Sequence, residues 1–232
     1  MAQSPVRNGR GGTAVAPRRG RPGYDLESLL AVAVTVFNER GYDGTSMEDL
    51  SRRLGIAKSS IYYHVDSKED LLALALDRAL DGLFSVADQV TASGGPAIER
   101  LEQLVRGSVQ VLADRLPYVT LLLRARGNTG TERKALARRR EFDQVVAELV
   151  AEAERDGEIR PDVDPAITAR LLFGLVNSLV EWYRPGRHLA VPASASSART
   201  LSAGTGGPGA ATELADAVCA VAFDGLRIRA AT

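Results

Sequence analysis

A short segment in the first third of the chain carries side chains that can bond to nucleic acid. Hydrogen-bond donors and aromatic rings crowd it, with no acidic residue among them: Lys58, Ser59, Ser60, Tyr62, Tyr63 and His64. Lysine can donate to guanine acceptors, serine hydroxyls to bases or phosphates, and tyrosine can touch thymine methyl groups or bond to phosphate. The alternative, that one of the two tyrosines fills the core, stays open.

Two short helices separated by a glycine are predicted to position this segment. Ser46 followed by Asp49 is typical of a capping box and starts the first helix, which ends at Gly55. The second helix runs from about residue 58 to 64. The inward set of the pair is apolar: Leu50, Leu54, Ile56 and Ile61. Such a pair can place its second helix in a major groove, although similar pairs also occur in proteins that do not bind DNA.

The stretch from Phe37 to Leu72, FNERGYDGTSMEDLSRRLGIAKSSIYYHVDSKEDLL, resembles the DNA-binding domain of the TetR (tetracycline repressor-like) family. The similarity lies in a first helix ending in Arg-Gly-Tyr, then Thr-Ser, an aliphatic helix, Gly-Ile, and a lysine before Tyr-Tyr-His and Ser-Lys-Glu. Together these features are far more specific than a helix-turn-helix pattern alone.

The resemblance implies a set of DNA-binding residues with three kinds of contact. Phosphate at the start of the second helix would be met by Thr45 and Ser46. Base edges would be reached by Lys58 and Ser59, and either bases or phosphates by Ser60. The DNA backbone would be clamped by Tyr62, Tyr63, His64 and Lys68. Arg52 and Arg53 are further phosphate candidates, unless they are simply solvated.

Three positions depart from the family pattern. Ala57 replaces a common serine, Val65 a usual phenylalanine, and Asp66 a common lysine or proline. We expect one helix cap to be missing, the hydrophobic plug to be smaller and nonspecific attraction to DNA to be slightly weaker.

Helical periodicity dominates the rest of the chain and predicts an all-α fold of about nine helices. A three-helix helix-turn-helix domain is expected over residues 24–70, and a helical ligand-binding and dimerisation domain over 71–232. Within the larger domain, helices are expected at about 97–113, 116–126, 131–156, 165–183 and 212–226, with a flexible loop at 190–211. Residues 1–23 are predicted to form a disordered basic arm that either touches DNA or only solubilises the chain.

The helix predicted at residues 164–183 is apolar almost all round, which a helix on the surface of a monomer does not need. With the final helix it resembles the four-helix dimer interface of the TetR family; the alternative is a central core helix in a monomer. A two-fold dimer would read double-stranded DNA as an inverted-repeat operator.

A small-molecule effector is expected among the middle helices. The segment LFGLVNSLVEWYRPG, residues 172–186, resembles actinobacterial TetR-like regulators of lipid, steroid or aromatic-acid breakdown, which tend to sense acyl-CoA thioesters. Arginines around an apolar cavity would suit the CoA phosphates, although a run of charge is more often a solvated helix face. The pocket residues predicted on this basis are Arg124, Phe142, Phe173 and Asn177.

The remaining composition argues against other classes of protein. The 232 residues carry no net charge, a single cysteine and two histidines, so no disulfide, clustered metal site or catalytic motif is expected. A GxGxxG string at residues 204–209 lies in a low-complexity stretch and follows no strand. We therefore expect a cytoplasmic protein that is no enzyme, binds no cofactor and spans no membrane, the rival being a helical scaffold without DNA function.

Overall fold

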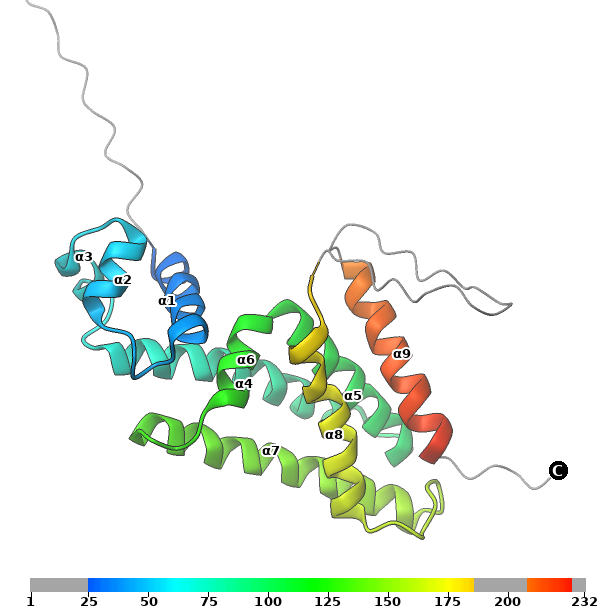
Figure 1. The fold of residues 1–232 in the computed structure, drawn as a ribbon. Coiled ribbons are helices and arrows are strands. Elements are labelled where there is room, and N and C mark those ends of the chain that lie inside the picture. The colour runs from blue at the N-terminus through cyan, green and yellow to red at the C-terminus, as the bar shows by residue number, and fades with distance from the viewer. Residues whose placement is uncertain (1–24, 186–207, 227–232) are drawn as a thin grey trace, which may run out of the picture.

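The computed structural model describes residues 25–185 and 208–226, and the helices found in those residues confirm the all-α fold class (Figure 1). In chain order they are α1 (Leu26–Arg40), α2 (Met47–Leu54), α3 (Lys58–Tyr62), α4 (Lys68–Ser93), α5 (Ala97–Asp114), α6 (Leu116–Arg124), α7 (Gly130–Arg155), α8 (Pro165–Trp182) and α9 (Pro208–Leu226).

Side-chain caps fix where five of these helices begin. At each of these helix starts a side chain accepts a hydrogen bond from a backbone N–H of the first turn, which would otherwise have no partner. The capping residues are Asp25, Ser46, Ser67, Thr129 and Asp164. Ser46 forms a full capping box with the residue three positions on. The capping box at Ser46 was predicted from the sequence, and the structure confirms it.

The three N-terminal helices form a head, and α4 carries it. Figure 1 shows α1, α2 and α3 at one end of the molecule, with α4 running from beneath them into the larger group of helices. Helix α4 is 26 residues long and packs on α1 as well as on α5, α6 and α7. One apolar core therefore runs through both parts, from Leu29 and Phe37 in the head to Leu104 and Phe142 in the body.

The last helix begins earlier than predicted. Helix α9 starts at Pro208 rather than near residue 212, so residues 208–211 do not belong to the predicted flexible loop. Proline suits the first turn of a helix, where its missing N–H costs nothing, and the alanines that follow favour helix. The predicted loop up to residue 207, the first four residues of the GxGxxG string and the basic arm over 1–23 lie outside the described residues.

Candidate nucleic-acid interface and internal pocket

Apolar packing and one left-handed glycine hold α2 and α3 against each other. Leu50, Leu54 and Ile61 are buried between them, and Gly55 adopts φ 66° and ψ 29°, a conformation that glycine reaches without a steric penalty. The Ser51 hydroxyl donates to the Ile56 carbonyl at 2.6 Å and closes the turn. The missing cap predicted at Ala57 is confirmed, because this residue starts α3 without a side-chain hydrogen bond.

The outer face of α3 is open to solvent. We call its exposed residues the α3 surface: Lys58, Ser59, Ser60, Tyr62 and Tyr63. Tyr62 is 45% exposed and Tyr63 86% exposed, so neither tyrosine fills the core, and His64 packs its ring edge-to-face on Tyr63 with centroids 5.2 Å apart. Exposed aromatic rings beside donors are available to bases, sugars and phosphates.

The predicted DNA-contact residues on either side of the α3 surface are already engaged inside the protein. Thr45 is buried and its hydroxyl donates to the Gly41 carbonyl at 2.8 Å. The Lys68 ammonium donates to the carbonyls of Tyr42 and Thr45, each at 2.8 Å, and sits 4.1 Å from the centre of the Tyr42 ring. These bonds fix the loop between α1 and α2, so the roles of Thr45 and Lys68 on DNA stay a prediction.

Charges beside the α3 surface are balanced within the head. Hydrogen bonds from Ser46 lower the pKa of Asp49, and the nearby Arg52 and Arg40 add to the effect. The Asp49 carboxylate lies 3.2 Å from the Arg52 guanidinium and 3.6 Å from that of Arg40. Asp49 therefore stays ionised, and its charge is offset by two cations on the same side of the head.

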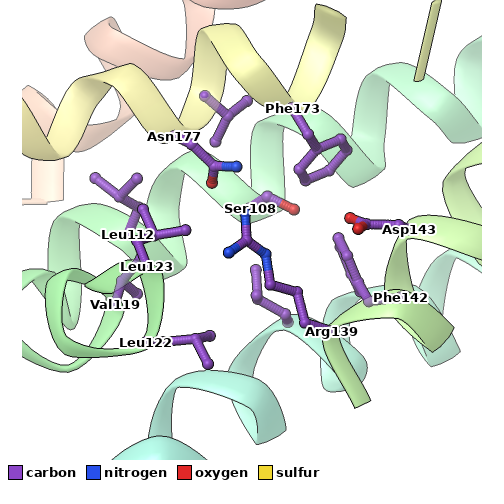
Figure 2. Close-up of a pocket in the computed structure, with 12 residues that line it drawn as sticks. Ser108, Leu112, Val119, Leu122, Leu123, Arg139, Phe142, Asp143, Phe173 and Asn177 are labelled. Atoms are coloured by element: carbon purple, nitrogen blue, oxygen red, sulfur yellow. The ribbon is translucent and has the colours of Figure 1, made fainter. Parts of the chain in front are cut away.

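An internal pocket of about 30 Å³ lies between α4, α5, α6, α7 and α8 (Figure 2). Its wall is mostly apolar, and Phe142 meets Phe173 edge-to-face at a centroid distance of 5.2 Å. The lining also holds polar side chains that point toward the centre in Figure 2: Ser108, Arg139, Asp143 and Asn177. Partial burial raises the pKa of Asp143, which Arg139 and Arg170 oppose.

The pocket contains part of the predicted set. Phe142, Phe173 and Asn177 line it, whereas Arg124 does not. Arg124 ends α6, and its guanidinium donates to the Asn38 carbonyl of α1 at 2.9 Å. It therefore points to the head, because the inward face of α6 is taken by leucines.

Sequence reasoning missed Ser108, Arg139 and Asp143 as lining residues. Arg139 was one arginine of a run in which its neighbour Arg138 is held by Asp77 and Asp81, at 2.7 and 2.8 Å. Nothing in the sequence distinguishes the two. The signal for Ser108 was weak but present, since it is a single hydroxyl on the buried face of an otherwise apolar helix.

A second cavity, of about 380 Å³, lies where the head meets the body. Its lining includes the end of α1, the loop before α2, and the segment that joins α6 to α7, with arginines at positions 40, 124 and 126. The Asn38 amide nitrogen donates across this junction to the Pro117 carbonyl at 2.8 Å. Helix α6 thus touches the internal pocket through Leu122 and the head through its end.

Residues 25–185 and 208–226 contain no group of three or more histidine, cysteine or acidic side chains placed to hold a metal ion. None of their helices is long and apolar enough to cross a membrane.

Comparison with known proteins covers both parts of the chain. Residues 29–75 match the family described as bacterial regulatory proteins, tetR family, and residues 94–197 match the tetracyclin repressor-like C-terminal domain. The HTH-type transcriptional repressor KstR2 of Rhodococcus jostii is 31% identical over 175 residues, which cover 74% of this chain and 85% of KstR2.

Solved structures agree in fold. SCO3833, a TetR family member from Streptomyces coelicolor A3, is 52% identical with a TM-score of 0.74, covering 88% of this chain and 92% of that one. AibR, solved in complex with isovaleryl coenzyme A and operator DNA, is 25% identical with a TM-score of 0.64, covering 85% of this chain and 97% of its own.

Proposed function

The chain belongs to the TetR family of bacterial regulatory proteins, and we propose that it is a dimeric repressor that a small effector releases from its operator. As a member of that family it is a helix-turn-helix transcription regulator. The observation that carries the DNA-binding assignment is the α3 surface, where donors and aromatic rings stand exposed on a helix anchored by a buried turn.

Within this proposal the residues of the α3 surface contact DNA in the major groove. Lys58 and Ser59 lie at the N-terminal end of α3, which is the end that reaches base edges in helix-turn-helix proteins. Ser60, Tyr62, Tyr63 and His64 bond to the flanking phosphates, and Ser46 meets phosphate at the start of α2. We assign Thr45 and Lys68 a supporting contribution, since their polar groups hold the loop that presents α2.

A mobility-shift titration tests the assignment. The double variant Lys58→Ala with Tyr63→Ala should bind an inverted-repeat operator at least about tenfold more weakly, because it loses a base contact and a phosphate clamp. Lys134→Ala, an exposed lysine on α7, removes the same charge away from α3 and serves as the control. Operator affinity equal to that of the parent in the double variant would show that α3 is not the reading helix.

A dimer follows from the outer face of α8. Large apolar side chains stand exposed there at helical spacing: Ile167, Leu171, Leu175 and Trp182. Gly174 on the same helix has no atom within 4 Å of where a Cβ would stand, so another backbone can approach closely. Val221 of α9 is 73% exposed, and α8 and α9 contact each other. We propose that a second copy covers these helices, which sets two α3 surfaces at successive grooves, roughly 34–36 Å apart.

The effector is proposed to be an acyl-CoA thioester or a related lipid or aromatic-acid metabolite. Two observations support this class of effector. The pocket wall is mostly apolar and includes Arg139. The chain is also similar to AibR, whose structure holds isovaleryl coenzyme A. A panel of acyl-CoA thioesters should raise the melting temperature and release operator DNA. If no thioester does either, this choice of effector is wrong.

Release from DNA is proposed to pass through α6. The pocket of about 30 Å³ is far smaller than the several hundred Å³ that bound ligands occupy, so an effector must push its walls apart. Helix α6 supplies Leu122 to the pocket and is tied to α1 through Asn38. Its displacement would move the head along with α4 and change the spacing of the two reading helices.

We further propose that the protein works in the cytoplasm, where bacterial operator DNA lies, and that its activity is binding rather than catalysis. The rival interpretation of the sequence, a helical scaffold without DNA function, is not supported, because the chain belongs to a family of transcription regulators.

A further inference from the structure

One buried hydroxyl in the internal pocket has no partner within the protein. Among the described residues, the buried side-chain nitrogen and oxygen atoms without a hydrogen-bond partner are Asn38 Oδ1 and Ser108 Oγ. Ser108 lies in the middle of α5 and is 1% exposed. An unsatisfied buried hydroxyl destabilises a protein, so its presence in a native structure calls for a partner that binds there.

Other helical hydroxyls in this protein behave differently. Thr35 donates to the Ala31 carbonyl at 2.9 Å, Thr120 to the Leu116 carbonyl at 2.7 Å, and Ser178 to the Leu175 carbonyl at 2.7 Å. This local bond is the usual way for a serine or threonine in a helix to satisfy its hydroxyl. The Ser108 hydroxyl does not use it, which leaves both its proton and its lone pairs to whatever enters the pocket.

The surroundings of Ser108 combine further donors with an apolar wall. In Figure 2 the Ser108 side chain faces the centre of the pocket, beside the Asn177 amide and the Arg139 guanidinium. The opposite wall consists of leucine, valine and phenylalanine side chains from α5, α6, α7 and α8. Amide and guanidinium nitrogens donate hydrogen bonds, whereas the Asp143 carboxylate, which also lines the pocket, accepts them. An acceptor oxygen of an effector is therefore suited to the side of the pocket formed by Ser108, Asn177 and Arg139.

We propose that Ser108 is a specificity-determining residue that donates a hydrogen bond to a carbonyl-type oxygen next to the apolar part of the effector. Asn177 and Arg139 supply further donors to that oxygen, and the apolar body of the effector lies against the phenylalanine and leucine wall. The inference rests on the proposed function, since it assigns the recognition chemistry of the same pocket. A ketone, a carboxylate and a thioester share this oxygen, and a hydrocarbon of the same shape lacks it.

The test compares ligands of one shape. Acetylcyclohexane, cyclohexanecarboxylate and isopropylcyclohexane have the same number of non-hydrogen atoms and differ in their oxygens, and cyclohexanecarbonyl-CoA adds the thioester arm. Melting temperatures of the full-length protein are measured over a range of concentrations of each, which gives an apparent affinity. We expect the oxygen-bearing ligands to raise the melting temperature of the parent protein more than the hydrocarbon does, and the ranking among the three identifies the source of the oxygen.

Two variants separate recognition from a structural role. Without ligand, Ser108→Ala should melt at the parent temperature or higher, because it removes an unsatisfied hydroxyl. With ligand, it should bind the best oxygen-bearing compound about tenfold more weakly, the usual effect of one lost hydrogen bond, and bind the hydrocarbon unchanged. Ser93→Ala, whose hydroxyl donates to the Val90 carbonyl at 2.8 Å at the exposed end of α4, is the matched control and should leave the ligand ranking as it is.

Three results would overturn the inference. One is a melting temperature of ligand-free Ser108→Ala several degrees below the parent, because the hydroxyl would then have a structural partner. Another is equal protection of the parent by the ketone and the hydrocarbon, and the third is no protection by any of the compounds. Operator binding is measured separately without ligand, so a failure there counts against the proposed function and leaves the melting results to be judged on their own.

Discussion

The side chains expected at the DNA interface separate into two groups by their hydrogen bonding within the protein. Lys58 and Tyr63 project from α3 into solvent, while Thr45 and Lys68 spend their polar groups on the backbone of the loop between α1 and α2. The two groups cannot be distinguished by residue type, since each contains a lysine and a hydroxyl. The difference arises because Lys68 starts α4 directly beneath that loop.

Replacement of the two lysines should therefore affect different properties of the protein: stability for Lys68 and operator binding for Lys58. Lys68→Met should lower the free energy of unfolding by about 2 kcal/mol, because it removes hydrogen bonds from a charged group to two carbonyls. Lys58→Met should leave stability within about 0.5 kcal/mol, as for most exposed positions, and weaken operator binding instead. Chemical denaturation followed by circular dichroism, paired with a mobility shift, measures both quantities.

The Lys68 role would be contradicted by an unchanged denaturation midpoint in Lys68→Met. A loss of operator affinity in that variant without any loss of stability would instead make the ammonium a direct phosphate contact, as the family resemblance implied.

At the scale of helices, the crossing of α4 and α5 depends on glycine. A Cβ atom built on Gly107 would stand 2.4 Å from Cγ1 of Val86 and 3.1 Å from its Cγ2, closer than real contacts allow. Gly82, on the other side of this crossing, would meet Val111 at 2.9 Å. The two helices thus approach each other over positions that cannot carry a side chain, which sets the direction of α4 relative to the pocket wall.

Gly107→Ala should destabilise the protein by about 1–3 kcal/mol, since overpacking outweighs the gain in helix propensity of roughly 1 kcal/mol. The double variant Gly107→Ala with Val86→Ala removes the methyl groups in the way, and it should be more stable than the sum of the two single changes predicts. Denaturant midpoints of the parent, the two single variants and the double variant give the four stabilities that this double-mutant cycle compares. Purely additive effects would mean that the helices shift apart at no cost.

Helix α6 contacts both the internal pocket and the head. One face contributes leucines to the internal pocket, and its ends are bonded to Asn38 of α1, through Pro117 and Arg124. Helix α6, which is nine residues long, therefore connects the internal pocket, where an effector would bind, to α1 in the head. Helix α6 has 9 residues and α5 has 18, so displacing α6 disrupts less packing than displacing α5 would.

In the assembled protein, we expect a second copy of the chain to cover the exposed apolar face of α8. Leu171 is 66% exposed in the single chain and stands between Ile167 and Leu175 on the same face. A two-fold interface would bury each substitution on this face twice, once in each subunit.

Leu171→Glu should accordingly raise the dimer dissociation constant at least about a hundredfold, because it would bury two like charges near each other. Leu74→Glu makes the same change at an exposed leucine on α4 and is the control. Sedimentation equilibrium measures the assembly, and operator affinity should fall together with the dimer. A Leu171→Glu protein that stays dimeric would place the interface elsewhere.

Local interactions could be predicted from the sequence alone. The caps at Asp25, Ser46, Ser67 and Asp164, the glycine turn at Gly55 and the apolar faces of α1 and α2 depend on residues a few positions apart, so spacing alone predicts them. The family was equally accessible, because the resemblance rests on about 36 consecutive residues of a single small unit.

The contacts of side chains whose neighbours come from distant segments could not be predicted in this way, and the folded structure was needed to establish them. It placed Arg124 against α1 across 86 positions of sequence, turned Lys68 onto a loop 23 positions earlier, and brought Ser108, Arg139 and Asn177 from α5, α7 and α8 to one pocket. An arginine has the same charge wherever it lies on a helix, and what it does depends on which helix packs against that face. Periodicity predicts that a face is buried, but the angles at which helices cross determine what it meets.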